Sequence, residues 1–203
     1  IPAELNSSNK RFNVKDIKEG LRYSRSEDDF MWLAGAGVAI PVYNVAEPSI
    51  PLLLNEKSSL FKLFLSDVGM LTTLYGKATK MQLLLDADDI NNGALYENVV
   101  AQELYAHGFK LYYYNSKKFG ELDFVIEYKG KVLPIEVKSG KSYQRHSALN
   151  SIIKVQNYSI EEAFVFSNFN VEKRNNIIYY PIYMVMFLSN DEIKFPKIDL
   201  ESF

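Results

Sequence analysis

The sequence predicts an α/β protein whose larger part, residues 91–203, has its elements in the order α-β-β-β-α-β. Helix-like and strand-like hydrophobic periodicities alternate along this part, and the 14 Tyr and 13 Phe favour strands. With 203 residues, the chain is long enough to bury a substantial core. A smaller unit, residues 1–75, is expected to precede this part, and residues 76–90 are expected to form a linker that carries a short helix.

The smaller unit combines short helices with one hairpin. Helices are expected near residues 1–8 and 14–20, and a third from Glu27, followed by a hairpin with prolines in its connection. The hairpin strands are expected at residues 38–45 and 61–65, before a helix at 68–75. This order is typical of a winged helix-turn-helix, a DNA-binding unit.

The charges near the expected DNA-reading helix conflict with each other. Arg22 and Arg25 precede that helix and are candidate DNA contacts, whereas Glu27, Asp28 and Asp29 in its first turn repel phosphate. A packing and dimerising role for the small unit therefore stays open beside DNA binding.

The larger unit is expected to begin with a helix capped by Asn91 or Asn92, running to His107 and ended by Gly108. The other elements expected are strands at 109–115, 121–128 and 131–138, a helix at 144–155, strands at 163–167 and 177–180, and a closing helix at 181–188.

The composition limits the chemistry. The chain has no Cys and only two His, so thiolate and histidine-rich metal sites are excluded and a metal would be held by oxygen. The net charge of -2 gives no general attraction to nucleic acid or anionic membranes. No apolar stretch is long enough to cross a bilayer and no signal peptide is visible, so we expect a cytoplasmic protein without a membrane partner. Because the chain starts at Ile1 without Met, we expect a fragment of a longer polypeptide.

The strands at 121–128 and 131–138 carry the most informative charges. If Lys129-Gly130 is a two-residue hairpin loop, Leu122, Phe124 and Ile126 share one apolar face of the ribbon with Val137, Ile135 and Leu133. The other face then places Asp123 opposite Glu136, and Glu121 opposite Lys138. The alternative is a solvated charged face.

Directly opposed carboxylates repel each other, so the pair Asp123 and Glu136 predicts a cation between them. Mg²⁺ or Mn²⁺ fits, with the Val137 carbonyl as a further candidate ligand. Lys138, on the same face, could orient a water or stabilise charge on a phosphate. Glu97 projects from an apolar helix stripe toward the sheet and is expected to join the site.

These residues, Glu97, Asp123, Glu136 and Lys138, resemble the motif of the PD-(D/E)XK nuclease-like, or restriction-endonuclease-like, fold. The resemblance implies that Asp123 and Glu136 are metal ligands, Lys138 is the catalytic lysine, and Glu97 supports the metal or its water.

Nearly the whole chain also resembles the C-terminal region of predicted AAA-type ATPases of bacteria and archaea. The likeness is carried by residues 1–5, 27–45, 61–69, 93–104, 120–140 and 181–188. In that family a P-loop domain precedes a winged helix and a nuclease-like domain of unknown function. Because this chain has no P-loop motif, ATP is expected only on an upstream ATPase domain, which would be its partner.

Basic residues are concentrated around the predicted site. Residues 110–154 contain nine Lys or Arg against four acids, which favours phosphate binding there. Lys141, Arg145 and His146, just after the third strand, are candidate contacts with a nucleic-acid backbone, and a solvated helix entrance is the alternative.

We therefore expect Mg²⁺-dependent cleavage of DNA, while RNA is not distinguished from DNA by the sequence and assembly into a homo-oligomer stays open. The alternative is a non-catalytic module that docks protein or DNA. Convergence of Asp123, Glu136 and Glu97 on one accessible point would favour the enzyme. Lysines bound to both Glu121 and Glu136, without a cleft, would favour the module.

Overall fold

The structure, a computed structural model, describes residues 30–85 and 92–190. The helices expected near residues 1–8 and 14–20, together with Arg22 and Arg25, lie outside the described residues. Of the helix expected from Glu27, residues 30–35 are described and are helical.

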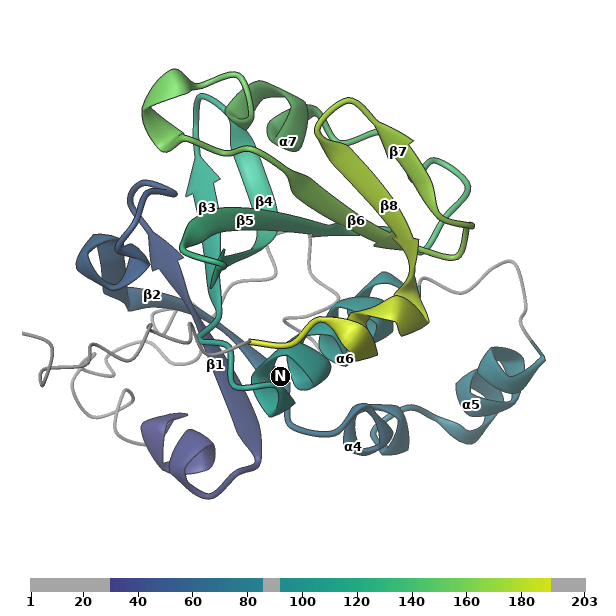
Figure 1. The fold of residues 1–203 in the computed structure, drawn as a ribbon. Coiled ribbons are helices and arrows are strands. Elements are labelled where there is room, and N and C mark those ends of the chain that lie inside the picture. The colour runs from purple at the N-terminus through teal and green to yellow at the C-terminus, as the bar shows by residue number, and fades with distance from the viewer. Residues whose placement is uncertain (1–29, 86–91, 191–203) are drawn as a thin grey trace, which may run out of the picture.

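One eight-stranded mixed sheet forms the centre of the molecule, in the order β2-β1-β3-β4-β5-β6-β8-β7 (Figure 1). Strands β3, β4 and β5 are antiparallel neighbours, whereas β5, β6 and β8 run parallel to each other. The strands are β1 (Ala39–Val45), β2 (Glu56–Leu65), β3 (Tyr112–Ser116), β4 (Gly120–Tyr128), β5 (Lys131–Val137), β6 (Ala163–Ser167), β7 (Glu172–Arg174) and β8 (Ile177–Pro181).

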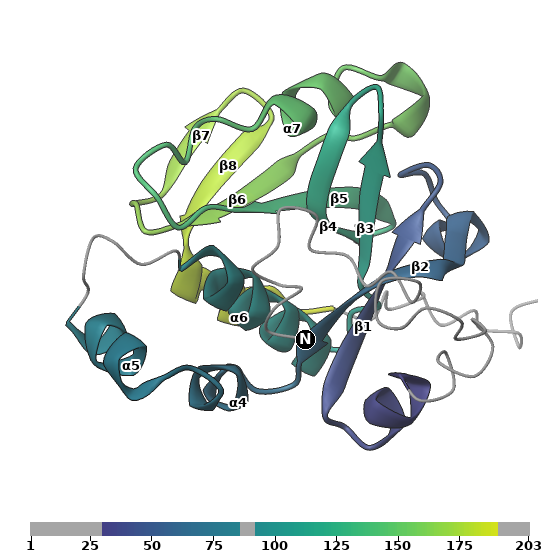
Figure 2. The same cartoon turned by 180° about the vertical axis from the view of Figure 1, so that it is seen from behind.

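Helices cover both faces of this sheet, as Figures 1 and 2 show from opposite sides. Helix α6 and the 3-10 helix η3 pack on one face, where they share a core cluster with Phe124 and Ile135. Helix α7 packs on the other face, with Val125 and Val165. The helices are η1 (Leu52–Asn55), α4 (Val68–Thr73), α5 (Lys77–Leu84), α6 (Gly93–Ala106), α7 (Ser147–Ile152), η2 (Gln156–Tyr158) and η3 (Ile182–Phe187).

The predicted hairpin of the small unit exists, but it does not stand apart from the larger unit. Strand β1 pairs in parallel with β3, so β1 and β2 extend the same sheet. The side chain of Asn98 on α6 also bonds both the N–H and the carbonyl of Leu65, each at 2.9 Å. The hairpin joins the sheet because it covers the edge of β3, whose residues Tyr112–Tyr114 are buried.

The loop of the β4–β5 hairpin has the predicted two residues. Lys129 and Gly130 have φ angles of 51° and 74°, as a tight turn with two left-handed residues requires. Phe124 therefore pairs with Ile135 and Ile126 with Leu133, which confirms the predicted register over this part of the ribbon.

One predicted feature of the ribbon is wrong. Between Tyr112 and Tyr114 of β3, the pairing with β4 shifts by one residue, so β4 carries a bulge near Asp123. The bulge turns Leu122 to the face of α7, whereas Phe124 and Ile126 stay on the face of α6. The apolar residues of β4 are thus divided between two cores.

Other differences lie at the ends of the larger unit. Strand β7 was not predicted, because three residues with the sequence Glu172-Lys173-Arg174 carry no apolar alternation. Helix α7 is shorter than expected, and the closing segment is a 3-10 helix rather than an α-helix. Asn92 lies at the N-cap of α6, although its side chain makes no capping hydrogen bond.

Candidate functional site

The candidate site lies where β4 separates from β5. The last ladder pair on this side joins Phe124 to Ile135, and beyond it the Asp123 carboxylate accepts the N–H of Val137 at 2.9 Å. The bulge in β4 interrupts the hydrogen-bond ladder here, so the Asp123 side chain, instead of a backbone carbonyl of β4, accepts the N–H of Val137 in β5. Asp123 is nearly buried and is fixed beside the carboxyl end of β5.

Glu136 and Lys138 are two residues apart on this end of β5, so an extended backbone places them on the same face. Lys138 Nζ lies 2.6 Å from Glu136 Oε1. Glu136 is buried, and its second oxygen, Oε2, has no hydrogen-bond partner among the described residues. One oxygen of this carboxylate is thus satisfied, whereas the other is a buried acceptor without a hydrogen-bond partner among the described residues.

The surroundings oppose the negative charge of Glu136. Burial raises the pKa of Glu136 to about 8, and the charge of Asp123 adds to the rise. The ammonium of Lys138 acts in the opposite direction, and the charge of Glu97 makes a smaller upward contribution. Asp123, Lys138 and Glu97 therefore each act electrostatically on Glu136.

Glu97 comes from α6, the helix that covers the opposite core of the sheet. Its side chain is buried among helix positions that include Ala94, Val100, Ala101 and Leu104, which are themselves buried. The prediction that Glu97 projects from an apolar stripe is thus confirmed. No group of three or more His, Asp or Glu side chains arranged to hold a metal ion occurs within residues 30–85 and 92–190.

Glu121 does not face Lys138, contrary to the prediction. Its carboxylate lies 2.6 Å from Lys62 Nζ and also accepts a hydrogen bond from Asn115. The bulge in β4 separates Glu121 from β5, and Lys138 pairs with Glu136 instead. The sequence analysis missed Lys62, because a single lysine in an apolar strand gives no sign that it reaches across the sheet.

The predicted phosphate contacts occupy different environments. Lys141 and Arg145 are exposed and form no ion pair with the described residues. His146, in contrast, is buried with Nε2 at 2.7 Å from the hydroxyl of Tyr179, so it is a packed core residue. Burial, with the charge of Lys138, lowers the pKa of His146. This corrects the expectation that His146 meets a nucleic-acid backbone.

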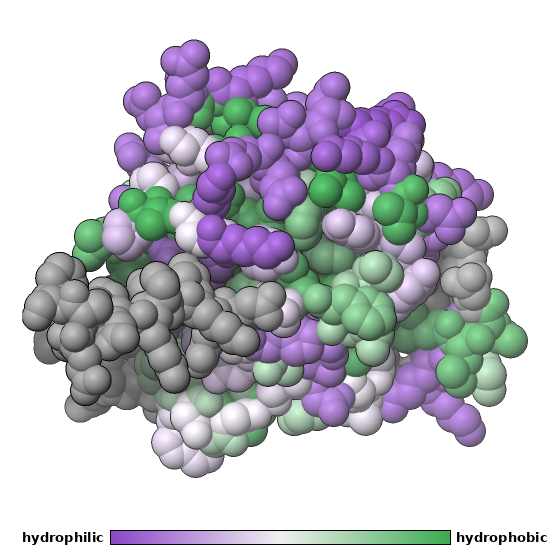
Figure 3. Space-filling view, in the orientation of Figure 1, coloured by the Kyte–Doolittle hydropathy of each residue, from purple (hydrophilic) through white to green (hydrophobic). Residues whose placement is uncertain are grey.

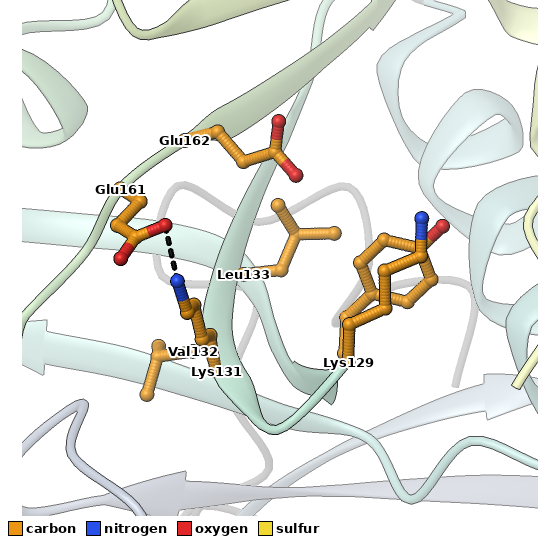
Figure 4. A pocket seen from close by; sticks show the side chains of 7 residues that line it. Lys129, Lys131, Val132, Leu133, Glu161 and Glu162 are labelled. Atoms are coloured by element: carbon orange, nitrogen blue, oxygen red, sulfur yellow. Dashed lines mark ion pairs between the residues drawn. The ribbon is translucent and has the colours of Figure 1, made fainter. Parts of the chain in front are cut away.

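Five pockets on the described part of the chain are lined by other residues, and none of these five is lined by Asp123, Glu136 or Lys138. Figure 4 shows one of about 220 Å³, which is lined by Lys129, Glu162 and the surface pair of Lys131 and Glu161. Glu121 and Glu136 are both bound by lysines, the arrangement expected of a docking module. Asp123, Glu136 and Glu97 are all buried, so the described residues do not show the convergence on one accessible point that was expected of an enzyme.

Fold and site together define a mixed α/β domain with a buried acidic cluster at the carboxyl end of a central strand. Residues 92–185 match the sequence profile of a domain of unknown function, DUF4143. This region includes Glu97, Asp123, Glu136 and Lys138. No curated protein and no solved structure matches the chain. None of the helices within the described residues combines the length and hydropathy needed to cross a membrane.

Proposed function

We propose that residues 92–190 form a PD-(D/E)XK-like nuclease domain that uses Mg²⁺ or Mn²⁺ to hydrolyse DNA phosphodiester bonds. The order of elements supports this proposal, because α6 is followed by three antiparallel strands, then by α7 and a strand parallel to β5. In such sheets, ligands bind outside the carboxyl ends of parallel strands, where Glu136 and Lys138 lie.

One observation carries the proposal. Asp123 and Glu136 lie together in a buried position, although like charges repel, and Glu136 Oε2 has no hydrogen-bond partner among the described residues. A fold that needed only a filled core would place an apolar residue at either position, since burying a carboxylate is costly. The cluster is therefore best explained by a ligand that needs two carboxylates.

A divalent cation fits this donor set. Asp123 and Glu136 offer hard oxygen ligands, and Mg²⁺ is commonly held by one or two carboxylates together with water and substrate phosphate. Two protein carboxylates would therefore suffice without a third. When bound, such a cation polarises a phosphoryl oxygen and lowers the pKa of a coordinated water.

The chain's own residues have distinct roles in this proposal. Asp123 is fixed by the Val137 N–H, so one of its oxygens is oriented while the other is left for a ligand. Lys138 is partly exposed beside Glu136 and can stabilise the charge that grows on a phosphate during hydrolysis. Glu97 adds a smaller negative contribution to the electrostatic potential at Glu136 from α6.

A second candidate function, a non-catalytic docking module, has one observation in its favour. Lysines occupy both Glu121 and Glu136, so a large part of the acidic charge is neutralised inside the protein. In this case the cluster would be structural, and the partner would bind elsewhere. Coupling to an upstream ATPase domain that binds ATP is compatible with either function.

The test is cleavage of supercoiled and single-stranded circular DNA by the 203-residue chain with Mg²⁺, Mn²⁺ or EDTA. We expect metal-dependent nicking, reduced at least about a hundredfold by Asp123→Asn, Glu136→Gln or Lys138→Met. Glu161→Gln is the matched control, because Glu161 is an exposed acid of a surface pair. Glu127 is unsuitable as a control, since its carboxylate accepts the N–H of Leu52 at 2.7 Å. Absence of cleavage with either metal, or unchanged cleavage in Asp123→Asn, would contradict the proposal.

A further inference from the structure

Three aromatic rings form a continuous series from the core to the surface near the candidate site. Tyr179 of β8 is buried and meets Tyr143 edge to face, with ring centroids 5.6 Å apart. Tyr143 in turn stacks on Phe169, at 4.1 Å and an interplanar angle of 20°. Phe169 is 36% exposed, so the series ends in a large apolar ring at the surface.

This series lies beside the acidic cluster. Phe169 follows β6, whose Phe166 carbonyl accepts the backbone N–H of Lys138 at 2.9 Å. From the other direction, His146 bonds the hydroxyl of Tyr179 and lies within electrostatic reach of Lys138. Tyr96 of α6, next to Glu97, donates its hydroxyl proton to Asn168, the neighbour of Phe169. The exposed ring is therefore at the same sheet edge as Lys138.

Positive charges flank the series on its outer side. Lys141 and Arg145 lie two residues on either side of Tyr143, and both are exposed. Arg174 and Lys154 line a pocket of about 220 Å³ between the end of α7 and the β7–β8 turn. Glu172, an acid on this surface, is paired with Arg174 at 2.6 Å. Hydrophilic side chains gather over the upper edge of the molecule in Figure 3, where α7 and β7 lie in Figure 1.

We propose that this surface binds an unpaired nucleic-acid strand, with a base stacked on Phe169 and the backbone held by Lys141, Arg145 and Lys154. Cleavage of the bound strand rests on the proposed function. A base stacked on Phe169 would bring the phosphates of the strand close to Lys138 and the carboxylates. This inference deepens the proposed function by naming the substrate class as single-stranded rather than duplex.

The choice of an unpaired strand follows from the geometry of stacking. In a duplex both faces of each base are covered by neighbouring pairs, so an exposed protein ring has no face to meet. Proteins that hold single strands combine a basic surface with aromatic rings on which bases stack. Tyr143 and Tyr179 support Phe169 from behind, and a ring held in this way loses little conformational freedom when a base arrives.

The experiment measures fluorescence anisotropy of a labelled DNA strand of mixed sequence, alone or annealed to its complement, with the full chain in EDTA. We expect the single strand to bind at least about tenfold more tightly than the duplex. Phe169→Ala and Phe169→Leu should each weaken single-strand binding by about 5- to 150-fold, because both remove the ring and Leu keeps apolar bulk. Phe169→Trp should retain binding.

Phe187→Ala is the matched control, since Phe187 is an exposed phenylalanine of η3 on the face of α6. It should leave binding unchanged within about twofold. Equal affinity for single strand and duplex, or unchanged binding in Phe169→Ala, would overturn the inference.

The two proposals fail in different ways. Phe169-dependent strand binding in EDTA without cleavage in Mg²⁺ or Mn²⁺ would reject the nuclease function and support the binding surface. Cleavage of duplex DNA that Phe169→Ala leaves intact would reject the binding surface and support the nuclease function. An RNA strand of the same sequence, run in parallel, identifies which nucleic acid is preferred.

Discussion

Two lysine–glutamate ion pairs of the sheet have the same N–O distance but differ in which partner is buried. Lys62 Nζ and Lys138 Nζ each lie 2.6 Å from their glutamate, Glu121 and Glu136 respectively. In the first pair the lysine is fully buried and the glutamate side chain is 23% exposed, whereas in the second the lysine is 28% exposed and the glutamate 7%. The first pair buries its lysine and the second its glutamate.

The neighbours of the two pairs explain what the difference means. Glu121 receives an amide hydrogen bond from Asn115, and Lys62 lies over the ring of Tyr113 at 4.9 Å. Each charge of the first pair thus has a second stabilising interaction besides the ion pair itself. Glu136 instead has Asp123 and Glu97 nearby, and both carboxylates oppose its ionisation. The first pair therefore has the features of a structural ion pair, whereas the second has the perturbed pKa that is common at functional sites.

The largest expected effect is on the first pair. Lys62→Met should lower the free energy of unfolding by about 1–3 kcal/mol, because the partly exposed Glu121 keeps its charge but loses its cationic partner. Urea denaturation followed by circular dichroism measures this change. The matched variant Lys138→Met should cost no more than about 1 kcal/mol at pH 6, since Glu136 holds a proton there. If both variants lost a similar free energy of unfolding, the two ion pairs would not differ in their contribution to stability.

The second expected effect is a pH dependence that belongs to Glu136. Its ordinary pKa of 4.5 is raised to about 8 in the folded chain, so between these pH values the folded state holds a proton that the unfolded state has lost. The contribution of Glu136 to stability is fully present below pH 4.5 and is lost as the pH rises through about 8. The slope reaches about 1.4 kcal/mol per pH unit.

Urea denaturation of wild type and Glu136→Gln across this pH range tests the assignment. The variant should lack the part of the slope that Glu136 contributes, and Glu161→Gln should keep it, because Glu161 is exposed. Parallel curves for wild type and Glu136→Gln would show that Glu136 has an ordinary pKa in the folded chain.

A smaller effect distinguishes the neighbours of Glu136. Asp123→Asn should lower the pKa of Glu136 more than Glu97→Gln does, because the charge of Asp123 makes the larger contribution. Asn retains an oxygen for the Val137 N–H, so the local backbone should be preserved. Carboxyl chemical shifts followed by NMR titration measure both variants, and the reverse order would contradict the described arrangement.

The smallest effect is expected at the surface. The Lys131–Glu161 pair in Figure 4 joins side chains that are 52% and 66% exposed. Glu161→Gln should therefore change the free energy of unfolding by no more than about 0.5 kcal/mol. If urea denaturation gave a larger change in the free energy of unfolding, the exposed Lys131–Glu161 pair could not serve as a control for the two buried pairs.

Local patterns in the sequence predicted much of the fold and of the cluster. The Lys129-Gly130 turn set the pairing of Phe124 with Ile135, and apolar spacing placed Glu97 on the buried stripe of α6. The same register predicted Asp123 directly opposite Glu136; the charge of Asp123 does act on Glu136, but the β4–β5 ladder ends at Phe124 and Ile135, before this pair.

Features that depend on contacts between distant segments could not be predicted in this way. The bulge in β4 arises from the fit to β3 and moved Leu122 to the second core and Glu121 to Lys62. The parallel pairing of β1 with β3 joined the hairpin to the main sheet. His146 was misread because only the tertiary structure brings Tyr179 to it, 33 residues along the chain.

The central claim is that Asp123 and Glu136 form a divalent-cation site, and titration calorimetry of the full chain with MnCl₂ tests it most directly. We expect saturable binding that Asp123→Asn and Glu136→Gln each abolish, while Glu161→Gln leaves it intact. Urea denaturation of the same variants shows that they are folded. Absence of Mn²⁺ binding by the wild-type chain, or equal binding by Glu136→Gln, would contradict the account.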